Sequence, residues 1–172
     1  GGVLRVSVPV PFGRLVGGSV IAEFQRRLPG VRLEVVLSNE RTDLLRDRID
    51  LAIRGGPMPD SGLIARRLAV ILLWLYGSPQ HGGTNLAQLP LIAAPGDEAR
   101  LRQRHPDLPA AAVLVDDRTA VRDALVAGAG AGVLPAFLGE PAREQGLLVR
   151  LSPEPLASLP VTNEGLRDSA RR

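Results

Sequence analysis

Residues 31–68 read VRLEVVLSNERTDLLRDRIDLAIRGGPMPDSGLIARRL, and this stretch decides the fold of the chain. In its first part, residues 31–37, apolar side chains alternate with charged ones, which is the period of a half-buried strand. The polar run Ser38-Asn39-Glu40 follows and has the composition of a turn. The pattern therefore predicts a strand that ends in a polar turn.

The second part of the stretch predicts a short helix, a buried strand and a loop. Thr42 can cap a brief helix that carries Leu44 and Leu45. The apolar run at residues 49–53 predicts the strand, and Arg54-Gly55-Gly56-Pro57 forms a loop by its composition.

A strand and a helix are predicted upstream of this stretch. Apolar and polar residues alternate over residues 4–8, and Pro9-Val10-Pro11 ends the run. A helix follows that has an apolar face and is weakened by Gly17-Gly18; the residues of the face are Leu15, Ile21, Phe24 and Leu28. Strands and helices alternating in this order are typical of a mainly parallel α/β sheet.

Downstream, the pattern predicts a second lobe that the chain enters and leaves on strands. Residues 70–75 are continuously apolar, and the polar run that follows them is read as the crossing into this lobe. A strand at 113–115, a helix at 118–127 capped by Asp116-Asp117, and a strand at 133–135 are expected inside it. A strand at 146–151 is expected to return to the first lobe.

Three segments carry a resemblance to a known family, and together they cover most of residues 1–151: IDLAIRGGPMPDSGLIARRL, LRVSVPVPFGRL and VRDALVAGAGAGVLPAFL. They resemble the effector (substrate)-binding domain of LysR-type transcriptional regulators. The resemblance implies a type 2 periplasmic-binding-protein-like α/β fold, in which two lobes are joined by hinge strands and enclose a ligand cleft. Lobe I is expected at residues 1–73 and 147–172, with its C-terminal part incomplete, and lobe II at residues 74–146.

The resemblance also implies a function and a set of partners. The chain is expected to sense a small-molecule effector, most naturally an anionic one, and to form a homo-oligomer. Promoter DNA would be bound only through an N-terminal winged helix-turn-helix that this chain lacks, and the location would be cytoplasmic without membrane contact. No cofactor and no enzymatic activity are expected.

The expected effector contacts follow from a rule about open α/β sheets, in which ligands bind outside the carboxyl ends of the strands. Backbone N–H groups at the start of a helix also suit a carboxylate or phosphate oxygen. The candidate effector-binding residues lie in four turns that meet these conditions: Pro9, Val10, Pro11, Phe12, Ser38, Asn39, Arg54, Gly55 and Asp116. The family often has serine where this chain has Pro11, so one side-chain contact is expected to be lost.

Each candidate also has a purely structural interpretation. Ser38 and Asn39 can stabilise a turn without any ligand, and Asp116-Asp117 can simply cap a helix. Arg54 can pair with Asp50 or Asp60 on the surface, and Phe12 can belong to the core.

The composition excludes several other classes of function. Cysteine is absent, and neither histidine has metal ligands at a suitable spacing. The pI near 10.8 does not indicate a large positive charge, because the net charge is only +3. It is high because all 21 basic residues are arginine, which keeps its proton to high pH. These arginines are scattered rather than gathered in one stripe, and the glycine-rich run at residues 128–132 closes a helix instead of opening one. DNA binding by this chain itself, a nucleotide loop, a metal site and a catalytic centre are therefore not expected.

Two other functions are compatible with the same fold. An extracytoplasmic solute-binding protein of the same fold is the main rival, and a transferase of this fold would need a catalytic cluster.

The chain begins Gly1-Gly2-Val3 without a methionine, so it is expected to be a fragment of a longer protein. Residues 160–172 contain few large apolar side chains, and a frayed C-terminus and a less stable first lobe are expected.

Overall fold

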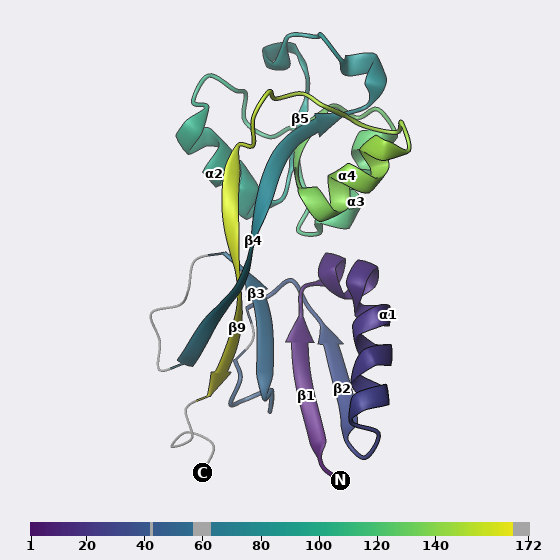
Figure 1. Cartoon of the computed structure of the whole chain (residues 1–172). Helices are drawn as coiled ribbons and strands as arrows, with labels where there is room; N and C mark the ends of the chain where they lie inside the picture. Colours follow the sequence, from purple (N-terminus) through teal and green to yellow (C-terminus); the bar gives the residue numbers. More distant parts are fainter. Residues whose placement is uncertain (42, 57–62, 167–172) are drawn as a thin grey trace. The chain divides into compact units, whose positions relative to one another are not determined.

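The computed structural model describes residues 1–41, 43–56 and 63–166, and packing contacts divide the chain into two compact units. Unit 1 comprises Gly1–Val70 and Pro160–Arg172, and unit 2 comprises Ile71–Leu159. Two long strands, β4 (Leu63–Gly77) and β9 (Ala157–Leu166), each supply residues to both units (Figure 1). The lobe boundaries expected from the sequence remain predictions.

Unit 1 contains the α/β elements that the sequence predicts around residues 1–55. They are β1 (Val3–Val8), α1 (Val10–Arg27), β2 (Arg32–Leu37) and β3 (Leu51–Gly55). The strand order is β2-β1-β3-β9; β1 is parallel to both β2 and β3, and β9 is antiparallel to β3. The mainly parallel α/β character is confirmed.

Helix α1 lies alongside β2 on one face of the unit 1 sheet (Figure 1), but Leu15, Ile21 and Leu28 of its expected apolar face remain 42–49% exposed. Val8 pairs with Leu37 on this face, and a Cβ atom on Gly13 of α1 would come within 2.2 Å of Leu37 Cδ2 and 3.1 Å of Val8 Cγ2. Glycine at position 13 therefore permits the close packing of the helix. The register also pairs Arg5 with Glu34 and Ser7 with Val36 on the opposite face, because side chains alternate along a strand.

The short helix predicted after β2 is not present. Residues 44–48 form turns, and Thr42, its expected cap, lies outside the described residues. Leu44 is buried against Ile49 and Ala52, whereas Leu45 is 59% exposed. One buried leucine followed by charged residues provides too little apolar contact to stabilise a helix of this length.

Unit 2 is a second α/β body with strand order β4-β7-β5-β6, and β8 pairs with β4. Its main core cluster joins Leu73 and Leu75 of β4 to Leu101 and Val133. The elements of this unit, besides parts of β4 and β9, are β5 (Leu91–Ala93), α2 (Pro95–Arg104), β6 (Val113–Leu114), α3 (Arg118–Val126), β7 (Ala131–Pro135), α4 (Ala136–Glu144), β8 (Val149–Arg150) and two 3-10 turns, Pro79–His81 and Leu86–Gln88.

A polar cluster joins α4 to β4. Glu140 of α4 accepts hydrogen bonds from Tyr76 Oη at 2.7 Å, from Arg143 Nη2 at 2.9 Å, and from Arg150. The hydrogen bonds from Arg143, Arg150 and Tyr76 lower the pKa of Glu140 to about 2, against the opposing effect of burial. Burial, followed by the Glu140 contact, raises the pKa of Tyr76.

The end of the chain differs from the expectation. The short strand β8 pairs with Tyr76 and Gly77 inside unit 2, and β9 is the strand that continues into unit 1. A strand is present within residues 146–151, but the prediction that it returns to the first lobe is wrong. The fraying predicted over 160–172 is also wrong for the described part, because Val161–Gly165 pair with β3. The polar residues Thr162 and Glu164 are buried in β9, which concealed the strand from a hydrophobicity pattern. Residues 167–172 lie outside the described part of the chain.

Candidate functional site

The carboxyl ends of β1, β2 and β3 form one edge of the unit 1 sheet, because these strands run parallel. Ligands of open α/β sheets bind at this edge. Six of the nine predicted effector-binding residues follow β1 or β2: Pro9, Val10, Pro11, Phe12, Ser38 and Asn39. Arg54 and Gly55, which were expected in a loop, are the last two residues of β3, and Asp116 lies in unit 2.

Two of the predicted turns are joined by hydrogen bonds. The backbone N–H of Val10 donates to Asn39 Oδ1 at 3.0 Å, and the N–H of Ser38 donates to the Val8 carbonyl at 2.9 Å. The side chain of Pro9, the N-cap residue of α1, offers no acceptor, so Asn39 satisfies one N–H that the helix start would leave unpaired. Ser38 Oγ accepts the N–H of Glu40 at 3.2 Å, which is the turn-stabilising role considered for this serine.

Some backbone N–H groups at the start of α1 already donate hydrogen bonds within the chain. The helix begins at Val10, and Pro11 is buried in its first turn. The N–H of Gly13 donates to the Pro9 carbonyl at 2.9 Å. Phe12 is half-buried in the same turn. The N–H groups of Val10 and Gly13 are thus engaged within unit 1.

Arg54 is buried, with 7% of its surface exposed, and Asp60, one of its two expected partners, lies outside the described residues. Its Nη2 donates to the hydroxyl of Ser7 at 2.7 Å, and its Nη1 donates to the Ile53 carbonyl at 2.8 Å. Burial lowers the pKa of Arg54, and the negative charge of Glu164 opposes that shift. Glu164 also accepts from Arg41 Nη1 at 3.2 Å. Arg54 therefore belongs to a buried polar cluster that links β1, β3 and β9, beside exposed Gly55.

In unit 2, Asp117 rather than Asp116 caps α3. Asp117 Oδ1 accepts the N–H of Thr119 at 3.0 Å, which confirms the capping interpretation for this residue. Asp116 is exposed immediately before it. The start of α3 thus fixes the position of the turn that carries Asp116.

A buried ion pair, which the sequence patterns did not indicate, anchors the same turn. Asp97 of α2 is 1% exposed and accepts two hydrogen bonds of 2.7 Å from Arg118, the first residue of α3. Arg100 Nη1 adds a third bond at 2.9 Å. Burial tends to lower the pKa of Arg118, but the hydrogen bond and charge of Asp97 outweigh it and raise that pKa.

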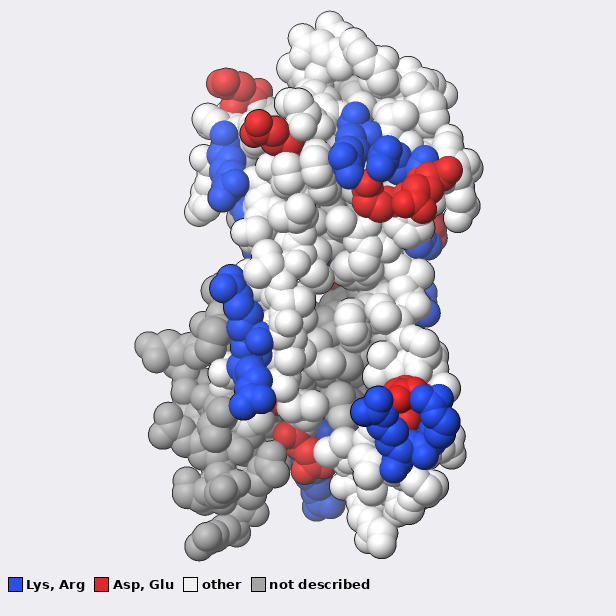
Figure 2. All heavy atoms as spheres, viewed as in Figure 1, with Lys and Arg blue, Asp and Glu red and all other residues white. Residues whose placement is uncertain are grey.

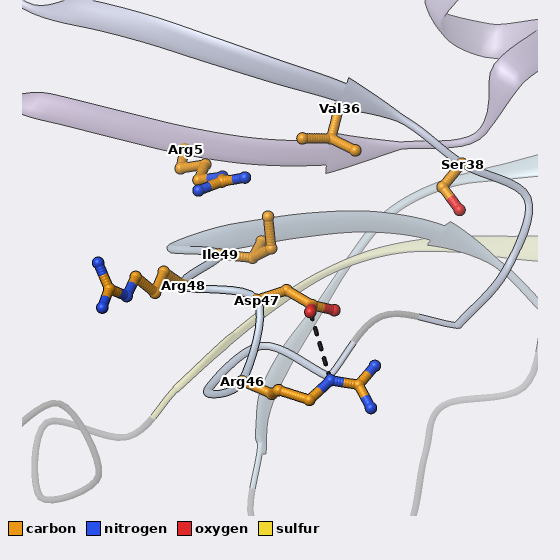
Figure 3. Close-up of a pocket in the computed structure, with 7 residues that line it drawn as sticks. All are labelled: Arg5, Val36, Ser38, Arg46, Asp47, Arg48 and Ile49. Atoms are coloured by element: carbon orange, nitrogen blue, oxygen red, sulfur yellow. Dashed lines mark hydrogen bonds and ion pairs between the residues drawn. The ribbon is translucent and has the colours of Figure 1, made fainter.

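Unit 1 also contains a pocket of about 480 Å³ on the sheet face opposite α1. Arg5 of β1, Val36 of β2 and Ser38 line one side, and the turn at residues 46–49 lines the other (Figure 3). Only Ser38 among the predicted residues reaches this pocket. The sequence patterns missed its arginines because Arg46 and Arg48 suit the solvated surface of a helix as well as a turn that faces the sheet.

Charged side chains on the face shown in Figure 2 form several separate groups with uncharged surface between them. Within residues 1–41, 43–56 and 63–166, no cluster of three or more His, Asp or Glu residues is arranged to hold a metal ion. None of the helices described for this chain combines the length and hydropathy that crossing a membrane requires.

Comparison with known proteins identifies the relatives of the chain. The family model described as LysR substrate binding domain matches residues 1–162. The HTH-type transcriptional regulator PtxR of Pseudomonas aeruginosa is 33% identical over 171 residues, which cover 88% of this chain and 54% of PtxR. The regulator CrgA of Neisseria meningitidis is 34% identical over 80 residues, which cover 46% of this chain and 27% of CrgA. The chain thus spans about half the length of PtxR.

Solved structures share the fold. The regulatory domain of CrgA, a LysR-type transcriptional regulator from Neisseria meningitidis, matches with a TM-score of 0.82 at 23% identity, covering 99% of this chain and 92% of that domain. The effector domain of the regulator AmpR of Pseudomonas aeruginosa matches with a TM-score of 0.81 at 24% identity, covering 97% and 86%. These matches establish a regulatory-domain fold of the periplasmic-binding-protein type.

Proposed function

Since the chain belongs to the LysR substrate-binding domain family, we propose that it is the effector-sensing and oligomerisation domain of a LysR-type transcriptional regulator. The observation that carries the proposal is the pair of polar turns at the carboxyl edge of the unit 1 sheet, joined through Val10 and Asn39. Relatives named as transcriptional regulators favour this function over the rival solute-binding protein.

The proposed mechanism is a shift between conformations. A ligand with different affinities for two arrangements of a protein favours the arrangement that it binds more tightly. In unit 1 the proposed contacts are the Ser38 hydroxyl, the Asn39 amide and the turn at Pro9, Val10, Pro11 and Phe12. Arg54 and Gly55 of unit 1 and Asp116 of unit 2 remain proposed contacts.

The proposed partners follow from the family. We infer a small effector that carries negative charge, because buried Arg54 and the start of α1 provide a positive potential near the turns. Promoter DNA would be contacted by a separate helix-turn-helix domain, for which the greater length of PtxR leaves room. The protein would act in the cytoplasm as a homo-oligomer and would bind its effector without converting it.

The test is calorimetric titration of the 172-residue chain with a panel of aliphatic and aromatic monocarboxylates. Asn39→Asp keeps an oxygen that can accept the Val10 N–H but adds a negative charge at the turn. We expect the best carboxylate of the panel to bind about 10-fold more weakly to this variant, because like charges repel at short range.

Asn85→Asp is the matched control, because Asn85 accepts the N–H of Ala87 at 3.0 Å in a comparable cap in unit 2. Its carboxylate affinity should equal that of the unaltered chain. The proposal fails if no carboxylate shows saturable binding, or if both variants lose affinity equally.

A further inference from the structure

The pocket opposite α1 has the size of a ligand site. Its volume of about 480 Å³ lies within the range of roughly 300–1,000 Å³ that small-molecule sites occupy. Residues 46–49, within and just after the turns at 44–48, line one side of it. Backbone hydrogen bonds from Asp47 to Asp43 at 3.0 Å and from Ile49 to Leu44 at 2.9 Å hold this turn in shape.

Positive charge predominates around the pocket. Arg5, Arg46 and Arg48 line it, and Asp47 is the acidic residue among the lining side chains. Arg46 Nε lies 3.3 Å from Asp47 Oδ1, so this pair is largely neutral. Arg48 has no ion pair with any residue that the structure describes.

Arg5 is only partly compensated. Its Nε lies 3.8 Å from Glu34 Oε2, which is an ion-pair distance but too long for a hydrogen bond. The same Nε is buried and makes no hydrogen bond within the described part of the chain. Although Nε itself is closed to solvent, the Arg5 side chain is 40% exposed and lines the pocket, so an anion there would meet a guanidinium group whose charge is only partly compensated.

The backbone at Arg48 is strained. Its φ of 55° lies in the left-handed region, which costs a residue with a Cβ atom roughly 1–2 kcal/mol and which glycine adopts freely. Strained residues of this kind concentrate at binding and active sites. An arginine at this position places a positive charge beside the pocket at a cost in stability that glycine would avoid.

Apolar and hydroxyl groups complete the pocket. Val36 and Ile49 face it from opposite sides, and Ser38 presents its hydroxyl at one end (Figure 3). Cationic groups beside apolar side chains suit a ligand that has a charged head and an apolar body.

We propose that this pocket binds a small organic carboxylate whose apolar body contacts Val36 and Ile49 and whose carboxylate is held by Arg48 and Arg5. This second site goes beyond the proposed function, because it lies on the sheet face opposite α1 and is lined by residues 46–49 rather than by the start of α1. It shares Ser38 with the turn site but not Val10 or Asn39. Ligand binding in this pocket would favour one conformation of the turns at residues 44–48, which lie just before β3.

The experiment uses phenylacetate as the probe and phenylacetamide as its uncharged isostere, titrated calorimetrically into the whole chain at constant ionic strength. Phenylacetate should bind saturably and phenylacetamide should not. We expect Arg48→Gln and Arg5→Gln each to weaken binding about 3- to 10-fold, because each removes a partly exposed charge next to the ligand. Amide NMR shifts should move at Val36 and Ile49.

Two further variants distinguish binding in this pocket from a general effect of charge or of stability. Arg26→Gln removes the same charge from α1, where the side chain is 69% exposed and paired with Glu23, and it should leave binding unchanged. Arg48→Gly should raise the thermal unfolding midpoint while weakening binding, since it relieves the strain and removes the charge.

The proposal is overturned if phenylacetate does not saturate, if Arg26→Gln weakens it as much as Arg48→Gln, or if phenylacetamide binds equally well. Loss of phenylacetate binding in Asn39→Asp with full binding in Arg48→Gln would assign the ligand to the turn site and also overturn it. Conversely, sensitivity to Arg48 without sensitivity to Asn39 would support this pocket even if the turn site failed its own test.

Discussion

Asp97 shows how a single buried charge can position a turn some twenty residues away in the sequence. Its carboxylate receives two 2.7 Å hydrogen bonds from Arg118 and one of 2.9 Å from Arg100, and its side chain is fully buried. Replacing it by alanine would leave Arg118 without its partner in a poorly solvated place. Breaking a buried pair in this way typically costs about 3–5 kcal/mol.

We therefore expect Asp97→Ala to lower the free energy of unfolding by about 3 kcal/mol, measured by urea denaturation of the whole chain. Asp123→Ala is the control, because Asp123 is 69% exposed and its pair with Arg122 is 3.3 Å long. A surface pair of this kind contributes less than about 1 kcal/mol. Equal losses in the two variants would show that the buried pair has no special role.

At the scale of elements, the sequence predicts secondary structure where the local residue pattern agrees with the packing of the folded chain. Strand β1 and helix α1 appear where periodicity and turn residues indicate them, whereas β3 spans Leu51–Gly55, two residues later than the apolar run at 49–53. The 44–48 turn was missed because its charges suit a helix surface as well as a turn, and only its contact with Ala52 decides between them. Strand β9 was missed because Thr162 and Glu164 are buried by pairing with another strand, which no local pattern records.

The candidate site was likewise predicted only in part from the sequence. The rule about carboxyl ends of parallel strands selected the turns at Val10 and Ser38, which the structure joins, because that rule depends only on strand order. The pocket at Arg5 depends on the shape of a turn and on register between strands. Such long-range information is not present in the spacing of residues along the chain.

Helix α1 carries two glycines whose effect on stability can be measured. Gly17 and Gly18 lie inside the helix, and a Cβ atom at either position would meet no atom within 4 Å. Alanine there should raise the free energy of unfolding by roughly 0.5–1 kcal/mol per site, because it lowers the entropy of the unfolded chain. Chemical denaturation of the single variants and of the double variant measures this gain.

Gly13→Ala is the opposing control in the same helix. Its Cβ atom would lie 2.2 Å from Leu37 Cδ2, the end of a side chain that is 42% exposed and can turn aside, and 3.1 Å from Cγ2 of buried Val8. We expect these contacts to cancel the gain, so that the free energy of unfolding rises by less than at Gly17 or falls by up to about 1 kcal/mol. If Gly13→Ala were as stabilising as Gly17→Ala, the close packing of α1 on β2 would be refuted.

At the scale of the whole molecule, both units contain parts of the same two strands, β4 and β9. Residues 63–70 of β4 and 160–166 of β9 belong to unit 1, although the rest of both strands lies in unit 2. Unit 1 therefore takes a strand of its sheet from the C-terminal end of the chain. Its stability should depend on residues more than a hundred positions away from β1, β2 and β3.

Truncation tests this dependence. A chain that ends at Leu159 keeps the unit 2 part of β9 but loses the pairing of Val161–Gly165 with β3, and it also loses Glu164, whose charge opposes the pKa shift of buried Arg54. An uncompensated buried charge and an uncovered strand edge both destabilise a sheet. Amide exchange should then show a large loss of protection in β1 and β3, with α3 and β7 of unit 2 still protected. A chain that ends at Leu166 retains both features and should exchange like the full chain; equal protection of β3 in the two truncated chains would mean that unit 1 does not need β9.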